Sequence, residues 1–249
     1  PDKSKLSKRK NPTSILDYLR RGILPEAVVN YLGRLGWSMP NEEEKFTLEE
    51  MQGAFDISRV SLGGPTFDIE KLKWLNGLWI RESLTQDELA NRLRDWALNS
   101  EMLDRILPHA QGRIEMLSDL IPQAAYLLSG ELPITAEAFG ESAETREEVV
   151  AQLQFVSWRL EAQQDWCREA LFAVLKELAE AMSLKPKALF APLFVALSGK
   201  AVAYSIPDSM AILGPYMTRA RLRRAIEACG GVSKKATKRL EKEYAALGL

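Results

Sequence analysis

The sequence predicts an all-α fold, and the clearest support comes from three capping boxes. In a capping box a threonine is followed three residues later by a glutamate, and each side chain can accept a hydrogen bond from the other residue's backbone N–H at a helix start. The three boxes begin at Thr47, Thr85 and Thr145. Apolar residues follow each box at helical spacing, whereas segments in which apolar and polar residues alternate are scarce. We therefore expect helices along nearly the whole chain.

The first long helix is expected to follow Leu24. Pro25 suits the first helical turn, because its missing N–H would have no partner within the helix. Gly36 is expected to end this helix. The apolar positions that should share its buried face are Val28, Tyr31, Leu32 and Leu35.

Two further helices are expected behind the capping boxes at Thr85 and Thr145. The apolar stripe of the first consists of Leu89, Leu93 and Trp96. That of the second consists of Val149, Leu153, Val156 and Leu160, and after a break near Gln163 it continues through Leu171, Val174 and Leu178.

Two segments of the second half have the composition of loops. Residues 129–143 are rich in glycine and proline, which makes them the best candidate linker. Apolar and polar residues alternate weakly over residues 201–206, a pattern that could indicate a strand. Because Gly199 and Pro207 bracket this segment, we expect a loop instead.

The composition excludes several classes of protein. The 249 residues carry a formal net charge of −1, with no apolar run long enough for a membrane span and no secretory signal. Cys167 and Cys229 lie far apart and His109 is the only histidine, so we expect neither a disulfide framework nor a metal site. These features are typical of a cytoplasmic protein.

The charges are unevenly distributed along the chain. Residues 131–180 hold eleven acidic and four basic residues, whereas residues 217–242 hold nine basic and two acidic ones. We expect two helices in this basic segment, separated at Gly230 and Gly231. Such a face can bind an RNA backbone, although it can equally be the solvated face of a terminal helix. The residues expected to face outward are Arg219, Arg223, Arg224, Lys235, Lys238, Arg239 and Lys242.

No motif in the chain supplies a complete active site. Neither GxxxxGK[ST] nor GxGxxG occurs, and no serine or cysteine is paired with a histidine at a supporting spacing. Carboxylate pairs such as Glu161 and Asp165 are typical of solvated helix surfaces. The residues alone therefore favour binding over catalysis.

The first ten residues are strongly basic, with five Lys or Arg against the single acid Asp2. Lys5, Lys8 and Arg9 lie at the centre of this segment. Flexible lysine side chains beside an arginine can clamp the phosphates of a nucleotide while negative charge moves to the leaving pyrophosphate. The alternative is a basic tail that is simply solvated.

The segment from Lys5 to Arg9 reads KLSKR and resembles the KMSKS-type signature of class I aminoacyl-tRNA synthetases, in the form common in glutamyl-tRNA synthetases. Residues 24–37 and 67–76 match that family's stem-contact region. The resemblance implies catalytic roles for the loop: Lys8 would bind the phosphate of ATP, supplied with Mg²⁺, and Lys5 and Arg9 would assist. The apolar residues in or just after the two blocks that we also expect in the core are Leu32, Trp37, Leu72, Trp74, Leu75 and Leu78.

The second half resembles the family's anticodon-binding region. Residues 192–199, PLFVALSG, are similar to a PLRxAxTG block, with Phe194 where the family commonly has arginine. Phe194 can stack on a base, although a core position is its alternative role. Residues 112–117 resemble the segment in which an arginine, here Arg113, reads the last anticodon base, and members strict for tRNA-Glu tend to keep it. The other residues expected to contact tRNA are Arg219, Arg223, Lys235 and Lys238.

The resemblance implies three helical domains. Residues 1–83 would form the lysine loop and the stem-contact domain. Residues 84–144 and 145–249 would form the two lobes of an α-helical, cage-like anticodon-binding region.

The implied parent enzyme activates glutamate with ATP and transfers it to tRNA-Glu, with tRNA-Gln as a further candidate substrate. DNA and membranes are not expected as partners, and the family expectation is a monomer. The chain starts with Pro1 and lacks the HIGH-type motif of the nucleotide-binding fold, so we expect a fragment that is inactive alone. The alternatives are a stand-alone helical tRNA-binding module and a non-enzymatic helical scaffold.

Overall fold

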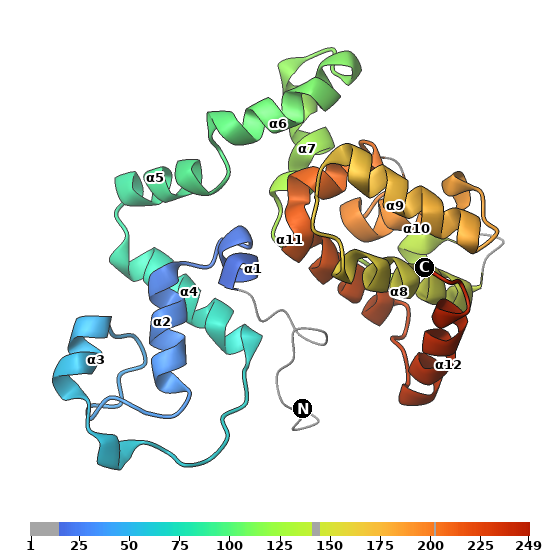
Figure 1. The fold of residues 1–249 in the computed structure, drawn as a ribbon. Helices are drawn as coiled ribbons and strands as arrows, with labels where there is room; N and C mark the ends of the chain where they lie inside the picture. The colour runs from blue at the N-terminus through green and yellow to red at the C-terminus, as the bar shows by residue number, and fades with distance from the viewer. Residues whose placement is uncertain (1–14, 141–144, 202) are drawn as a thin grey trace. The chain divides into compact units, whose positions relative to one another are not determined.

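The computed structural model describes residues 15–140, 145–201 and 203–249, which form helices, turns and loops without a β-strand (Figure 1). The prediction of an all-α fold is confirmed. The chain divides into two compact units, Pro1–Ser100 and Glu101–Leu249, and each unit has its own hydrophobic core. Within the described ranges, no helix is both long enough and apolar enough to cross a membrane.

The first unit is built from short helices that begin at the predicted signals. Pro25 occupies the first turn of its helix, and the capping boxes at Thr47 and Thr85 form both of their reciprocal hydrogen bonds. The elements are α1 (Ile15–Arg20), α2 (Pro25–Arg34), α3 (Leu48–Ala54), the 3₁₀ turn η1 (Ile57–Arg59), α4 (Ile69–Ser83) and α5 (Gln86–Trp96).

The main core of the first unit lies where α2 packs against α4. Its buried side chains are Tyr18, Ile23, Ala27, Val28, Tyr31, Leu72, Leu75 and Trp79. Two hydrogen bonds fix the relative position of the two helices: Asn76 Oδ1 accepts from the N–H of Leu24 at 2.8 Å, and the Tyr31 hydroxyl accepts from the N–H of Asp68 at 2.6 Å.

A buried amide joins three segments of this unit. Asn30 Oδ1 accepts from Trp79 Nε1 at 3.1 Å and from the N–H of Phe46 at 3.3 Å, and Asn30 Nδ2 donates to the Glu44 carbonyl at 3.2 Å. Asn30 is 2% exposed, so water does not compete for these bonds. A second, smaller core of Trp37, Met39 and Phe46 packs beside α3.

Three residues expected in apolar stripes or in the core are exposed instead. Leu32 on α2 is 50% exposed, Trp74 on α4 is 43% exposed and Leu93 on α5 is 41% exposed. Each lies at helical spacing from buried neighbours but just beyond the edge of the packed face. The prediction that these side chains are buried was wrong.

The second unit is larger and contains most of the chain's buried residues. Its α8 starts at the capping box of Thr145, and the break predicted near Gln163 separates α8 from α9. The elements are α6 (Ser100–Ala110, which starts at the last residue of the first unit), the 3₁₀ turns η2 (Gln111–Arg113) and η3 (Leu117–Asp119), α7 (Leu120–Leu128), η4 (Ala136–Phe139), α8 (Arg146–Glu161), α9 (Arg168–Ala181), α10 (Pro186–Ser198), α11 (Ile206–Ala228) and α12 (Lys234–Ala245).

Helix α11 is the central element of this unit and packs against α7, α8, α9 and α10. The core around it includes Leu153, Leu160, Leu171, Leu175, Leu178, Leu193 and Leu222, all at most 1% exposed. Gly214, with φ 75° and ψ 173°, bends α11 in front of Pro215.

Arg221, on α11, is an arginine inside this core. It is 2% exposed, and its guanidinium donates to the carbonyls of Leu197, Tyr126 and Ser129, the last two at 2.6 Å. These carbonyls belong to the C-terminal ends of α7 and α10, where helices leave carbonyls without helical partners. Arg221 therefore ties α7 and α10 to α11 and is part of the core, although it lies in the basic segment of the sequence.

The compact units divide after Ser100, whereas the predicted domains divide at 83/84 and 144/145. Met102, Ile106 and Tyr126 share one core with residues of α8 to α11, so the helices on both sides of 144 pack as one body. The division into three domains stays a prediction.

Candidate nucleic-acid interface

A cavity of about 260 Å³ in the second unit brings together residues that are far apart in the sequence. It lies between η2, the first turn of α7 and the loop in front of α11. Its polar and aromatic lining consists of Arg113, Gln123, Tyr126, Lys200 and Tyr204. The volume is below the roughly 300–1,000 Å³ of pockets for drug-sized ligands, so it suits a single small ring.

Arg113 is exposed at the mouth of this cavity and is held from two sides. Its Nη1 donates to the Ala203 carbonyl at 3.0 Å, and its guanidinium carbon lies 5.3 Å from the centre of the Tyr204 ring. Gln123 Nε2 donates to the backbone carbonyl of Arg113 at 2.9 Å. Because a guanidinium has five N–H donors, most of them remain for a ligand.

Lys200 brings a second positive charge to the cavity. Gly199 ends α10 with φ 72°, and Ser198 Oγ then accepts from the N–H of Lys200 at 3.2 Å. The Lys200 ammonium donates to the Pro122 carbonyl at 3.1 Å, on the opposite wall. A cavity with two cations at its edge favours an electron-rich or anionic ligand.

Two tyrosines form the inner wall of the cavity. The Tyr126 and Ser209 hydroxyls are 2.7 Å apart, and Ser209 Oγ also lies 3.4 Å from the Tyr204 carbonyl. Burial raises the pKa of Tyr204, an effect that the charge of Arg113 partly offsets. Burial also raises the pKa of Tyr126 to about 12, while the hydrogen bond between Tyr126 and Ser209 opposes the shift.

The raised pKa of Tyr126 predicts a loss of stability at alkaline pH. The ordinary pKa is 10, so the neutral form stabilises the fold fully below pH 10, and this contribution is lost as pH rises toward about 12. We expect Tyr126→Phe to make the fall in the free energy of unfolding between pH 10 and 12 shallower. Phenolate absorbance would be titrated against pH for the original chain and for Tyr126→Phe, and the difference between the two curves reports the ionisation of Tyr126. We expect the midpoint of this difference near pH 12. A midpoint near pH 10 would contradict the raised pKa of Tyr126.

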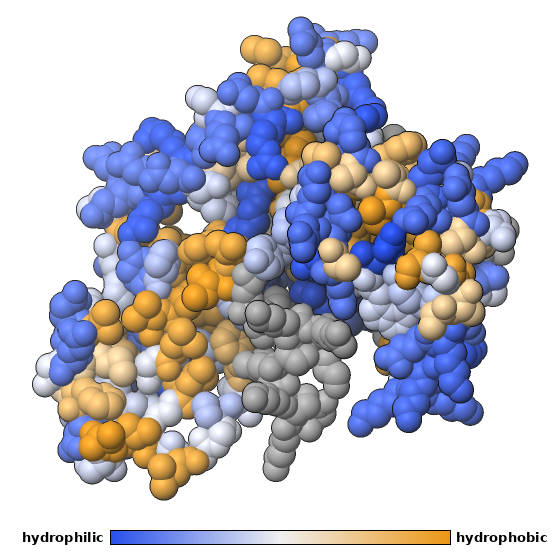
Figure 2. Space-filling view, viewed as in Figure 1, coloured by the Kyte–Doolittle hydropathy of each residue, from blue (hydrophilic) through white to orange (hydrophobic). Residues whose placement is uncertain are grey.

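The basic face of α12 is exposed as predicted. Figure 2 displays this helix as a continuous hydrophilic surface, and Lys235, Lys238 and Lys242 are all exposed. Leu240 is buried, and Ala236 and Tyr244 are half-buried, so the apolar side of the helix is the one that packs.

Arg219 is only partly exposed to solvent, which differs from the expectation that it faces outward. It is half-buried, its Nη2 donates to the Leu160 carbonyl at 2.5 Å, and its guanidinium lies 5.6 Å from the ring centre of Trp166. It therefore closes the C-terminal end of α8. Arg223 is likewise half-buried, and exposed Arg224 pairs with Glu131 at 3.1 Å.

Phe194 lies on α10 and packs, half-buried, against the core of the second unit. Its surroundings favour the structural alternative over base stacking.

Trp74 of the first unit is more accessible than Phe194. The Lys71 ammonium lies 4.0 Å from the Trp74 ring centre and also donates to both Glu44 carboxylate oxygens at 2.7 Å.

Glu44 is the centre of an ion-pair cluster on the first unit. The hydrogen bond from Lys71 is the main cause of a lowered pKa at Glu44, and Arg34, whose Nη2 lies 2.8 Å from Glu44 Oε1, adds to it. Since the cluster is partly solvated, we expect it to orient Lys71 and Trp74 more than to stabilise the fold.

The predicted loop residues Lys5, Lys8 and Arg9 lie outside the described residues. Among the residues that are described, no group of three or more His, Cys, Asp or Glu side chains could hold a metal ion.

The sequence motif pointed to Arg113, whose role stays a prediction, but gave no sign of the residues that share its cavity. Lys200 and Tyr204 follow Arg113 by about ninety residues, and Gln123 lies on the next helix. The available signal was the break in helical pattern between Gly199 and Pro207, which marks a loop able to present side chains.

Comparison with known proteins identifies the family. The family model described as "Anticodon binding domain" matches residues 88–226, more than half of the chain. The chain belongs to this family. Its matched region includes Arg113, Lys200 and Tyr204 but excludes α12. A second model, described as the catalytic domain of class I tRNA synthetases (E and Q), matches residues 1–74.

Relatives that match along the whole chain bear the name glutamate–tRNA ligase. The chain is 59% identical over 247 residues to a glutamate–tRNA ligase of Cellvibrio japonicus, covering 99% of this chain and 49% of the relative. It is 55% identical over 249 residues to that of Marinobacter nauticus, covering 100% and 50%. A solved glutamate tRNA ligase of Elizabethkingia meningosepticum is 24% identical with a TM-score of 0.48, covering 84% of this chain and 42% of that one.

The chain thus spans about half the length of the curated relatives that it matches. The resemblance to glutamyl-tRNA synthetases, which rested on a few short motifs, extends along essentially the whole chain and is confirmed.

Proposed function

We propose that this chain is the tRNA-binding portion of a glutamate–tRNA ligase, with tRNA-Glu as its main partner and a monomeric parent enzyme. The observation that carries the proposal is the extent of the match between this chain and its relatives. Two proteins named glutamate–tRNA ligase are 55–59% identical to this chain over 99–100% of its length. The anticodon-binding family model over residues 88–226 supports the same assignment for the second unit.

Within this function, the cavity at Arg113 receives the last anticodon base. The guanidinium offers several N–H donors in one plane, which suits hydrogen bonding to a base edge. The Tyr204 ring and the nearby Lys200 supply an aromatic wall and a positive charge. Arg113 would then favour tRNA-Glu over tRNA-Gln, which corresponds to strict charging.

The first unit contacts the tRNA stem, and the loop residues Lys5, Lys8 and Arg9 serve the adenylation step of the whole enzyme, in which ATP, supplied with Mg²⁺, is a substrate. We expect no glutamyl-adenylate from this chain alone, because its sequence lacks the HIGH-type motif. Glutamate-dependent ATP–pyrophosphate exchange by the purified chain would contradict this part of the proposal.

Binding of the chain to tRNA-Glu, tRNA-Gln and an unrelated tRNA tests the function directly. We expect tight binding that favours tRNA-Glu, with a slope of log K against log[salt] of about −3 to −6, since several phosphates are contacted. Absence of binding to every tRNA would reject the proposal in favour of a helical scaffold.

Arg113→Ala is expected to reduce the preference for tRNA-Glu over tRNA-Gln about tenfold, because one good base contact contributes roughly 1–3 kcal/mol of discrimination. Affinity for the unrelated tRNA should change little. Lys176→Ala, which removes an exposed charge from α9, is the control and should leave the preference intact. Equal loss of affinity for all three tRNAs would make Arg113 a phosphate contact and not a base reader.

A further inference from the structure

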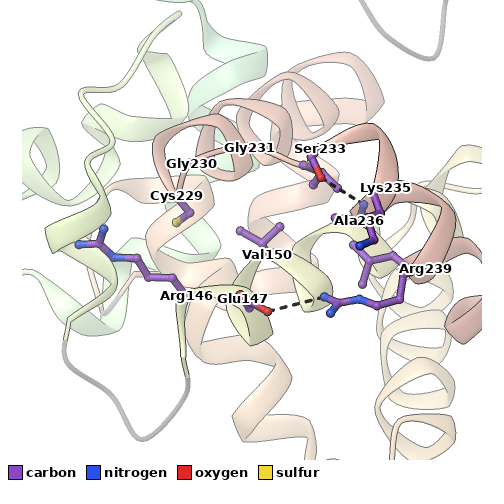
Figure 3. A pocket seen from close by; sticks show the side chains of 12 residues that line it. Arg146, Glu147, Val150, Cys229, Gly230, Gly231, Ser233, Lys235, Ala236 and Arg239 are labelled. Carbon is purple, nitrogen blue, oxygen red and sulfur yellow. Dashed lines mark hydrogen bonds and ion pairs between the residues drawn. The ribbon is translucent and has the colours of Figure 1, made fainter.

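Two cavities of the second unit differ in how their charged side chains are held. The larger one, of about 430 Å³, lies between the first turn of α8 and the turn that joins α11 to α12, and in it Arg146 points away from Arg239 (Figure 3). Arg239 is also paired with Glu147 at 3.7 Å and with Glu243 at 3.6 Å. The cations of this cavity therefore do not converge on one ligand atom. At the smaller cavity, around Arg113, the polar side chains are tied to the backbone of neighbouring segments.

Three hydrogen bonds form a closed ring around the cavity at Arg113. The Arg113 guanidinium donates to the Ala203 carbonyl at 3.0 Å, and the Lys200 ammonium donates to the Pro122 carbonyl at 3.1 Å. Gln123 Nε2 completes the ring by donating to the Arg113 carbonyl at 2.9 Å. Each bond joins a side chain of one segment to the backbone of another, so η2, the first turn of α7 and the loop after α10 hold one another in place.

The backbone at Arg113 has little regular structure of its own. Arg113 is the last residue of the three-residue turn η2, and Ile114 is extended, with φ −106° and ψ 140°. Because a 3₁₀ turn of this length makes few and poorly aligned hydrogen bonds, side chains must fix its direction. Asp119 Oδ2 accepts from the two backbone N–H groups that follow Ile114, at 3.0 and 2.9 Å. Asp119 and Gln123 both belong to the start of α7, so this helix is the support from which Arg113 is presented.

Gln123 is placed to hold Arg113, whereas Arg113 is placed to meet a ligand. Gln123 is partly buried and its amide nitrogen is bonded to the chain, while Arg113 is exposed at the mouth of the cavity. One N–H of the guanidinium is bonded to the Ala203 carbonyl, and the planar group has others for a base edge. Hydrogen bonds to a base depend on the direction of each donor, so a rotation of the Arg113 backbone would misalign them.

We propose that Gln123 is a positioning residue for Arg113: its hydrogen bond fixes the backbone from which Arg113 reaches the last anticodon base, and it thereby raises the selectivity for tRNA-Glu. The inference rests on the proposed function and adds to it a residue that acts through another. Phosphate contacts carry no base identity, so Gln123 should influence discrimination between tRNAs and not the affinity that all tRNAs share.

Gln123→Met tests the proposal, because methionine has a similar length but no hydrogen-bond donor. We expect the preference for tRNA-Glu over tRNA-Gln to fall about threefold, the scale of one net hydrogen bond. Affinity for an unrelated tRNA and the salt slope should not change, since the phosphate contacts remain. Gln164→Met, at an exposed glutamine between α8 and α9, is the matched control and should leave the preference intact.

A double variant separates positioning from direct contact. If Gln123 acts only through Arg113, adding Gln123→Met to Arg113→Ala should cause no further loss of preference. A further threefold loss in the double variant would make Gln123 a base contact itself and overturn the positioning role. If Gln123→Met matches the Gln164→Met control while Arg113→Ala lowers the preference, the inference is wrong and the proposed function stands.

Hydrogen exchange tests the positioning without tRNA. Peptides covering residues 111–119 should exchange faster in Gln123→Met than in Gln164→Met, whereas α9 peptides should exchange at the same rate in both. Unchanged exchange of residues 111–119 would overturn the inference by itself. Absence of tRNA binding by the original chain would instead reject the proposed function, and the effect of Gln123 on selectivity would fall with it.

Discussion

Replacing Arg221 by methionine is expected to lower the free energy of unfolding of the second unit by about 3–5 kcal/mol. Methionine fills a similar volume, but the carbonyls of Leu197, Tyr126 and Ser129 lose their donors, and each buried polar group left unpaired costs roughly 1–3 kcal/mol. Urea unfolding, monitored by the hydrogen exchange of peptides from α7, α10 and α11, measures the loss of stability of the second unit separately from the first.

Arg224→Met is the matched control for this prediction. Arg224 lies one turn further along α11, is exposed and pairs with Glu131 at 3.1 Å. An exposed ion pair contributes at most about 1 kcal/mol, so this variant should remain nearly as stable as the original. Equal stability of the two variants would mean that the Arg221 hydrogen bonds do not hold α7 and α10 to α11.

The second large effect is expected at Asn30 in the first unit. Asn30→Leu is similar in size but leaves the Trp79 indole N–H, the Phe46 N–H and the Glu44 carbonyl without their partner. We expect a loss of about 3 kcal/mol, visible as faster hydrogen exchange in α2, α4 and the segment around Phe46.

Leu32→Ala serves as the control on the same helix. Leu32 is 50% exposed, so its truncation should cost less than about 1 kcal/mol. If Leu32→Ala lowers the free energy of unfolding as much as Asn30→Leu does, the outer face of α2 must be packed. The side chain of Leu32 would then be buried, as its helical spacing predicted.

Local signals in the sequence predicted the helices well. The capping boxes at Thr47, Thr85 and Thr145 each form both reciprocal bonds, and Pro25 begins α2, because these signals act over three or four residues. The break between α8 and α9 and the loop before α11 were predicted for the same reason.

Tertiary contacts were not predictable from such signals. Helical spacing marks an apolar stripe but not the width of the neighbour that covers it, which is why Leu32 and Trp74 are exposed. Arg219 was expected to face solvent, yet it bonds a carbonyl 59 residues away. Arg221, in the same basic segment, bonds carbonyls 24 and 95 residues away. No local pattern distinguishes an arginine that closes a helix end from one that meets solvent.

The candidate site also combines a residue that a local motif pointed to with residues that only tertiary packing brings together. Arg113 was identified through a family motif, whereas Lys200, Tyr204 and the cavity that they share depend on how α7, α10 and α11 pack.

We claim that the cavity at Arg113 reads the last anticodon base, and a double-mutant cycle is the sharpest test of this role. The affinities of the original chain and of Arg113→Ala would be measured for tRNA-Glu and for the same tRNA changed only at that base. We predict that the base change weakens binding to the original chain but has little effect on the variant, a coupling of about 1–3 kcal/mol. Additive effects of the two changes would contradict the claim.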